Sequence, residues 1–138
     1  MKKEFLIESI NELKLVSSEI LKLMKNQKIF LLYGDMGSGK TTLVGELCKQ
    51  IEITDHSSPT YGIINHYLSP SYGDVFHADC YRLLKENDAI NCGLIELIDQ
   101  NEYCFIEWPE KIQNLLPDNC VKIKLNVQNN IREITLSI

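Results

Sequence analysis

Residues 34–41 contain the stretch that decides the fold, which reads Gly34-Asp35-Met36-Gly37-Ser38-Gly39-Lys40-Thr41. It matches G-x-x-x-x-G-K-T, the P-loop, whose glycines let the backbone curl until successive N–H groups point at phosphate oxygens. In such loops the lysine reaches the β- and γ-phosphates, and the hydroxyl that follows it binds Mg²⁺. The sequence therefore predicts binding of a nucleoside triphosphate with magnesium. The predicted contacts from this region are Asp35, Met36, Gly37, Ser38, Gly39, Lys40, Thr41 and Thr42.

The flanks of the octet support this interpretation. Residues 28–33 are a short apolar run of strand type, and residues 41–51 follow with helical spacing. A strand, a loop and then a helix is the context in which a P-loop works. The alternative, a glycine-rich turn without a ligand, is disfavoured by that context.

Composition sets the broad class. The 138 residues, 44% hydrophobic and 24% charged, are typical of one globular domain spanning residues 1–138. No apolar run is long enough to span a membrane and the first residues lack a signal-peptide core, so a cytoplasmic location without membrane contact is expected. The net charge of −5 disfavours wide contact with a nucleic-acid backbone by this chain alone.

Arginine is scarce, with Arg82 and Arg132 standing against twelve lysines. Kinases of small molecules usually close an arginine-bearing lid on the transferred phosphoryl group, because the planar guanidinium matches its geometry. This chain has little from which to build such a lid. A small-molecule kinase is therefore disfavoured, and an enzyme that hydrolyses its nucleotide with so few arginines is expected to be slow on its own.

Hydrophobic spacing predicts an α/β sandwich with a largely parallel central sheet flanked by helices, the P-loop NTPase-like class. A helix over 9–25 is expected to bury Ile10, Leu13, Ile20 and Met24. Residues 57–59 are expected to break the chain before an extended segment over 60–68 and a turn over 69–73. One or two short helices are expected within 85–100, with Asp88 as N-cap. Further strands are expected at 5–7, 75–79, 103–107, 121–127 and 134–138.

Two of the predicted strands end on an acidic residue. Asp79 closes one apolar run and Glu107 closes another. In open α/β sheets, ligands bind beyond the carboxyl ends of parallel strands, so both acids are expected to face Lys40 and Thr41. One acid would hold the metal or its water, and a second would orient the attacking water. The alternative for each is a helix cap or a solvated side chain.

Three further residues have open interpretations. Thr60, after Ser58 and Pro59, either reaches the γ-phosphate or metal as a switch threonine or belongs to an ordinary turn. A lone strand histidine such as His77 is more often structural than catalytic. Trp108, the only tryptophan, is either core or a partly exposed aromatic that contacts a partner.

Four separated motifs then occur in one order along residues 30–115: Gly34-Asp35-Met36-Gly37-Ser38-Gly39-Lys40-Thr41-Thr42, Ser58-Pro59-Thr60-Tyr61, His77-Ala78-Asp79-Cys80-Tyr81-Arg82-Leu83 and Ile106-Glu107-Trp108-Pro109-Glu110. This series resembles the TsaE family, the small P-loop ATPase subunits of bacterial tRNA threonylcarbamoyladenosine synthesis. The P-loop alone is common to many families, whereas the other three motifs in this order are far more specific. Residues 13–16 depart from the family's N-terminal pattern, which commonly lies near the adenine, and Ala78 stands where phenylalanine is usual.

The resemblance implies Mg²⁺-dependent hydrolysis of ATP to ADP and phosphate, which cycles a partner complex of TsaD and TsaB; tRNA would be met only through that complex. Carried over residue by residue, Lys40 binds phosphate, Thr41 and Glu107 serve the metal, and Asp79 is the other acid. Thr60 corresponds to the switch-like threonine. Arg132 falls in the family's C-terminal segment near the nucleotide.

Two other function classes remain open. A GTPase is disfavoured because the guanine-reading N-K-x-D pattern is absent from the sequence. A nucleotide-gated interaction module, in which ATP binding controls assembly and hydrolysis is incidental, is partly compatible with the ATPase. Phosphate release measured with and without partners distinguishes the interaction module from the ATPase.

Overall fold

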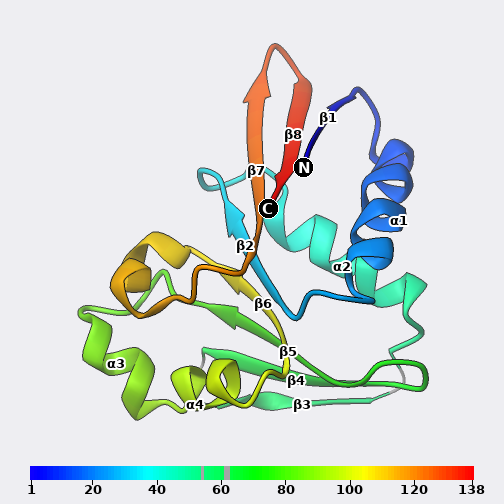
Figure 1. Cartoon of the computed structure of the whole chain (residues 1–138). Helices are drawn as coiled ribbons and strands as arrows, with labels where there is room; N and C mark the ends of the chain where they lie inside the picture. Colours follow the sequence, from blue (N-terminus) through cyan, green and yellow to red (C-terminus); the bar gives the residue numbers. More distant parts are fainter. Residues whose placement is uncertain (54, 61–62) are drawn as a thin grey trace.

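A computed structural model describes residues 1–53, 55–60 and 63–138, with the backbone alone over residues 55–60. The described strands form one eight-stranded sheet in the order β1-β8-β7-β2-β6-β5-β4-β3. Figure 1 shows this twisted sheet with β1, β7 and β8 at one end and β3 and β4 at the other. The strands are β1 (Lys2–Ile7), β2 (Ile29–Tyr33), β3 (Asp55–Thr60), β4 (Ile64–Ser69), β5 (Gly73–Asp79), β6 (Tyr103–Glu107), β7 (Val121–Gln128) and β8 (Ile131–Ser137).

The four central strands are parallel. β2 pairs in parallel with β6 and with β7, and β6 pairs in parallel with β5. The outer strands β1, β8, β4 and β3 are joined to this centre by antiparallel pairs. The predicted largely parallel central sheet is therefore confirmed, with antiparallel strands added at both edges.

Helices cover both faces of the sheet (Figure 1). One face packs against α1 (Leu13–Leu23) and α2 (Lys40–Gln50); the other packs against α3 (Glu86–Asn91), α4 (Leu94–Asp99) and the 3₁₀ segment η2 (Pro109–Leu115). A strand covered on both faces is apolar throughout, and β2 is an example, since Phe30 and Leu32 enter one core while Ile29 and Leu31 enter the other. The sandwich predicted from the sequence is thus confirmed.

This alternation places the acidic strand ends. Phe105 packs in the core beneath α1 and α2, and side chains two residues apart on a strand share a face. Glu107 therefore points toward α2, whose first turn contains Lys40 and Thr41. The parallel register sets Glu107 beside Asp79 on β5 and beside Leu32 on β2, which places both acids next to the end of the strand that leads into the P-loop.

Several local predictions are corrected by the structure. A 3₁₀ turn over Ile10–Glu12 precedes α1, and Ile10 is 59% exposed because it lies ahead of the apolar stripe formed by Leu13, Val16 and Ile20. Val127, next to the turn between β7 and β8, and Ile138, which follows β8, are also exposed. None of the described helices has the length and apolar character needed to cross a membrane.

Three further predictions concern residues 57–59, residues 60–68 and the start of α3. Residues 57–59 do not break the chain but lie within β3, where a register shift between Ser57 and Thr60 accommodates them. The expected extended segment over 60–68 includes residues 61 and 62, which lie outside the described residues. Asp88 is not an N-cap: it lies in the first turn of α3, and its carboxylate accepts the backbone N–H groups of Leu84 and Lys85.

Candidate nucleotide-binding site

The loop over residues 34–39 joins β2 to α2 and needs glycine at two positions for different reasons. Gly39 adopts φ +103°, in the left-handed region that favours glycine, and α2 begins at the next residue. Position 34 has no room for a side chain, because a Cβ there would lie 2.5 Å from Ser38 Oγ and 2.8 Å from the Leu125 carbonyl oxygen. The backbone thus wraps tightly around the start of α2.

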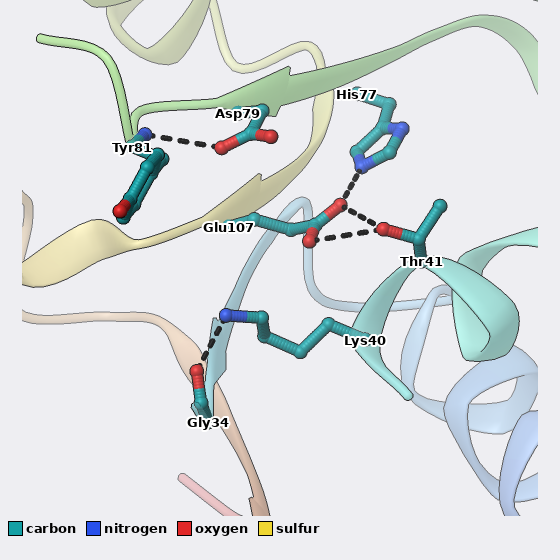
Figure 2. Close-up of polar contacts among 7 residues, drawn as sticks. All are labelled: Gly34, Lys40, Thr41, His77, Asp79, Tyr81 and Glu107. Atoms are coloured by element: carbon teal, nitrogen blue, oxygen red, sulfur yellow. Dashed lines mark hydrogen bonds and ion pairs between the residues drawn. The ribbon is translucent and has the colours of Figure 1, made fainter. Parts of the chain in front are cut away.

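Lys40 occupies the first turn of α2 with only 5% of its surface exposed. Its ammonium donates a hydrogen bond to the Gly34 carbonyl at 2.5 Å and lies 3.9 Å from the centroid of the Trp108 ring. Figure 2 shows the side chain turned back across the loop, toward Gly34 rather than Glu107. A buried ammonium is thereby held by a carbonyl dipole and an aromatic face, in the position from which it would meet a phosphate.

Trp108 has an unusual backbone conformation. Its φ of 56° and ψ of 49° lie in the left-handed region, which is costly for a bulky side chain. This backbone conformation turns the chain from β6 into η2 and places the indole over the Lys40 ammonium. The centroid of the indole lies 4.9 Å from the centroid of the Tyr81 ring. Strained residues concentrate at functional sites. Trp108 therefore lines this candidate site, a role that differs from both possibilities left open by the sequence, which were core packing and contact with a partner.

Glu107 is buried and bound on two sides. The Thr41 hydroxyl lies 3.2 Å from each carboxylate oxygen, and His77 Nε2 lies 2.5 Å from Oε2 (Figure 2). Burial raises the pKa of the Glu107 carboxyl group. Hydrogen bonds from His77 and Thr41, together with the nearby charge of Lys40, outweigh burial and hold this pKa below its usual value. Glu107 is therefore an anion at neutral pH.

Asp79 lies at the end of β5, beside Glu107 in the sheet and exposed to solvent. Its Oδ1 accepts the backbone N–H of Tyr81 at 3.0 Å, a local turn that fixes the carboxyl group (Figure 2). The turn uses one of the two carboxylate oxygens. The expected juxtaposition of Asp79 and Glu107 is therefore present, and the solvated side chain that was the alternative also describes Asp79, which is exposed.

These residues surround one cavity of about 250 Å³, large enough for a chain of phosphate groups. Its lining consists of Met36, Gly37, Gly39, Lys40, Thr41, Thr42, Asp79, Tyr81, Glu107, Trp108 and Arg132. Arg132 reaches it from β8, and a Cβ on Gly39 would lie 3.3 Å from Arg132 Nε. This Nε is buried and has no hydrogen-bond partner among the described residues. A guanidinium whose buried Nε lacks a partner among the described residues, beside a lysine, a threonine and an ionised acid, fits a magnesium-bound polyphosphate.

Two predicted contacts, Asp35 and Ser38, are placed differently, and the side chain of a third, Thr60, is not described. Asp35 and Ser38 line a neighbouring cavity of about 340 Å³, against β7, and the Ser38 N–H is already donated to the Asp35 carbonyl. Ser38 Oγ is buried without a partner among the described residues. The side chain of Thr60 lies outside the described part of the chain, so its expected proximity to phosphate stays a prediction.

The sequence leaves two residues of the site undecided and gives a third no role. His77 has an open interpretation in which a structural role is favoured, Trp108 is also open, and Tyr81 has no assigned role. The period of two along β5 places His77 on the same face as Asp79, which was the available signal for His77. Tyr81 and Trp108 follow the two acidic strand ends, and their mutual contact depends on the turns after β5 and β6, which local sequence does not predict.

The strand–loop–helix that begins at β2, and the acids gathered at the carboxyl ends of parallel strands, define a P-loop fold. A protein-family model described as "Threonylcarbamoyl adenosine biosynthesis protein TsaE" matches residues 7–134. The chain belongs to the TsaE family, whose members act in tRNA threonylcarbamoyladenosine biosynthesis. The resemblance noted from the motifs is therefore confirmed.

Individual relatives agree. The tRNA threonylcarbamoyladenosine biosynthesis protein TsaE of Rickettsia bellii is 30% identical over 131 residues, covering 94% of this chain and 90% of the relative. The protein of that name from Borreliella burgdorferi is 34% identical over 113 residues, covering 80% of this chain and 81% of the relative. The crystal structure of Bacillus subtilis YdiB superposes with a TM-score of 0.76 at 27% identity, covering 99% of this chain and 84% of YdiB.

Proposed function

We propose that this chain is a magnesium-dependent ATPase that hydrolyses ATP to ADP and phosphate and thereby cycles a TsaB–TsaD complex during threonylcarbamoyladenosine modification of tRNA. One observation supports this proposal most strongly. Lys40, the Thr41–Glu107 pair and Arg132, whose buried Nε has no hydrogen-bond partner among the described residues, all line a single cavity at the P-loop. These groups are suited to bind a polyphosphate and its metal ion. Membership of the TsaE family indicates the pathway, tRNA threonylcarbamoyladenosine biosynthesis.

Lys40 and the loop backbone would bind the phosphates. The contacts that Lys40 makes to Gly34 and Trp108 are replaced when its ammonium moves to the β- and γ-phosphates. Arg132 would complete the cradle from β8, where its buried Nε would gain the hydrogen-bond acceptor that it lacks among the described residues. Both side chains supply positive charge where phosphate charge accumulates, which is the main source of catalysis in phosphoryl transfer.

Thr41 and Glu107 would hold Mg²⁺, the threonine by its hydroxyl and the glutamate by its carboxylate or through a water. Bound magnesium neutralises charge on the β- and γ-phosphates. Asp79 would orient the attacking water with the carboxylate oxygen that the Tyr81 turn leaves free. Thr60 would contact the γ-phosphate or the metal as a switch-like residue.

The base would occupy a second cavity, of about 440 Å³, between the start of α1 and α2. It is lined by Ile10, Asn11, Leu13, Lys14, Thr42, Gly45, Glu46 and Lys49. Thr42 lines both this cavity and the phosphate cavity, so the two lie next to one residue at the start of α2. Exposed Ile10 supplies an apolar surface for a purine, which gives this side chain a function outside the core.

The pathway implies partner proteins, and we assign TsaD and TsaB to this role by family membership. The net charge of −5 supports contact with tRNA through the assembled complex rather than by this chain alone. The ATPase would act in the cytoplasm, where tRNA is modified.

A nucleotide-gated interaction module is the second candidate, favoured by one contact. Trp108 covers Lys40 on one side and meets Tyr81 on the other, and the Tyr81 side chain is 44% exposed. Occupation of the phosphate site would therefore be communicated to the surface, with or without hydrolysis. The two candidates differ in turnover, since only the ATPase releases phosphate repeatedly.

Calorimetric titration with ATP and GTP, in magnesium and in EDTA, tests the binding step, and a phosphate-release assay tests turnover. We expect ATP to bind more tightly with magnesium than without it, and GTP to bind more weakly than ATP. Lys40→Ala should remove binding of both. The absence of ATP binding in the wild-type chain would contradict the proposal.

A further inference from the structure

We infer that His77 is a positioning residue for the metal site: its imidazole holds the Glu107 carboxylate in the orientation that serves Mg²⁺ beside Thr41. This inference rests on the proposed function and deepens it, because it assigns a role within that site to a residue that would otherwise be structural. It depends on the contact between His77 and Glu107 and on where each side chain lies in the sheet.

His77 and Glu107 come from neighbouring parallel strands but do not lie directly opposite one another. Phe105 is the register partner of His77, and Glu107 lies two residues further along β6, beside Asp79. The imidazole therefore reaches along the face of the sheet toward the carboxyl ends of the strands. Both side chains are nearly fully buried, with 8% and 5% exposed, so no bulk water competes for the contact.

The direction of the hydrogen bond follows from chemistry. At 2.5 Å, His77 Nε2 and Glu107 Oε2 must share a proton, and a carboxylate that serves a metal carries none, so Nε2 is the donor and Oε2 the acceptor. This donor occupies Oε2 at 2.5 Å. Among the described residues, Oε1 accepts only the Thr41 hydroxyl, at 3.2 Å. His77 thus fixes one oxygen and leaves the other available at the site of the proposed metal.

The surroundings of His77 keep the imidazole in place. The ring stacks against Tyr67 of β4 at a centroid distance of 6.4 Å, on the side of the sheet that α1 and α2 cover. Side chains that orient a metal-binding carboxylate in this manner typically affect metal affinity or activity about 10- to 100-fold when removed. A histidine with a purely structural role would instead affect the stability of the fold and all ligand binding together.

Two variants separate the donor from the shape of the ring. His77→Gln keeps an N–H donor near the position of Nε2, whereas His77→Asn keeps an amide that is too short to reach Glu107. Binding of a fluorescent ADP analogue is measured in magnesium and in EDTA for the wild type and both variants, and kcat and KM for ATP are measured in parallel. The ratio of the two dissociation constants reports the magnesium-dependent gain in affinity independently of turnover.

For His77→Asn, we expect the EDTA affinity to stay within about twofold of the wild type, while the magnesium-dependent gain and kcat each fall about tenfold. His77→Gln should retain both within about threefold. The inference is overturned if His77→Asn keeps the full gain, if the EDTA and magnesium affinities fall together, or if His77→Gln loses the gain. The magnesium-dependent gain of His77→Gln tests the inference even if the His77→Asn variant does not fold. A wild-type chain without any magnesium-dependent gain would instead overturn the proposed function.

Discussion

The ammonium of Lys40 lies 3.9 Å from the centroid of the Trp108 ring while it donates a hydrogen bond to Gly34. Two residues that are 68 positions apart in sequence are thus in direct contact at the proposed phosphate site. The contact connects the P-loop to the turn after β6, and Trp108 adopts a left-handed backbone conformation in order to make it. Nucleotide binding that draws Lys40 toward phosphate must break or weaken this contact.

Tryptophan fluorescence should therefore report nucleotide binding. Trp108 is the only tryptophan, so emission excited where tyrosine does not absorb comes from this ring alone. We expect ATP with magnesium to change the emission intensity with the same concentration dependence as binding measured by calorimetry. Lys40→Met, which keeps the apolar stem but lacks the charge, should abolish the change. Unaltered wild-type emission at saturating nucleotide would show that Lys40 does not leave the ring.

Glu107 should be essential for hydrolysis. Glu107→Ala is expected to abolish phosphate release, and Glu107→Gln, which keeps the size but loses the charge, is expected to lower kcat at least about 100-fold. Glu110→Gln is the matched control, because Glu110 is exposed and lies only three residues further along the chain. A fully active Glu107→Ala enzyme would remove this residue from the site.

Arg132 should contribute to nucleotide affinity. Its buried Nε has no hydrogen-bond partner among the described residues, and a charged hydrogen bond contributes about 1.5–3 kcal/mol. Arg132→Gln is therefore expected to raise the dissociation constant for ATP about tenfold or more. Arg82→Gln removes the other arginine, which is exposed, and should leave the dissociation constant within about twofold. Equal effects of the two changes would argue for general electrostatics instead of a specific contact.

The core behind the site depends on an aromatic pair. Phe30 of β2 and Phe105 of β6 stack with ring centroids 4.8 Å apart, and both are buried beneath α1 and α2. Phe105→Ala should lower the free energy of unfolding by about 3–5 kcal/mol, as measured by urea denaturation. Leu84→Ala, at a side chain that is 94% exposed, should change it by less than about 0.5 kcal/mol. A small effect of Phe105→Ala would mean that the core relaxes into the vacated space.

The central fold could be predicted from the sequence because its signals are local. The P-loop fixes a strand, a turn and a helix, and the apolar runs that end at Asp79 and Glu107 are short enough to be strands and apolar enough to be buried. Parallel pairing of β2, β6 and β5 then brings both acids to the end of the P-loop strand, as expected.

The predictions that were wrong, or that were not made, depend on tertiary contacts. Ile10 has the spacing of a core residue, but it precedes α1 in a 3₁₀ turn, so its side chain is exposed. The inclusion of residues 57–59 in β3 depends on a register shift against β4 that has no local signature. The contact of His77 with Glu107 crosses two strands, and periodicity gives the face of a side chain without giving its partner.

Phosphate release from ATP by the purified chain, alone and with a TsaB–TsaD pair, tests the central claim most directly, with Lys40→Ala as the blank. We expect slow turnover by the chain alone, well below the roughly 1–100 s⁻¹ of kinases, because only Arg132 of the two arginines lines the cavity. The rate should rise with the partner pair and vanish in Lys40→Ala. Tight ATP binding with no partner-dependent release of phosphate would contradict the ATPase and favour the nucleotide-gated module.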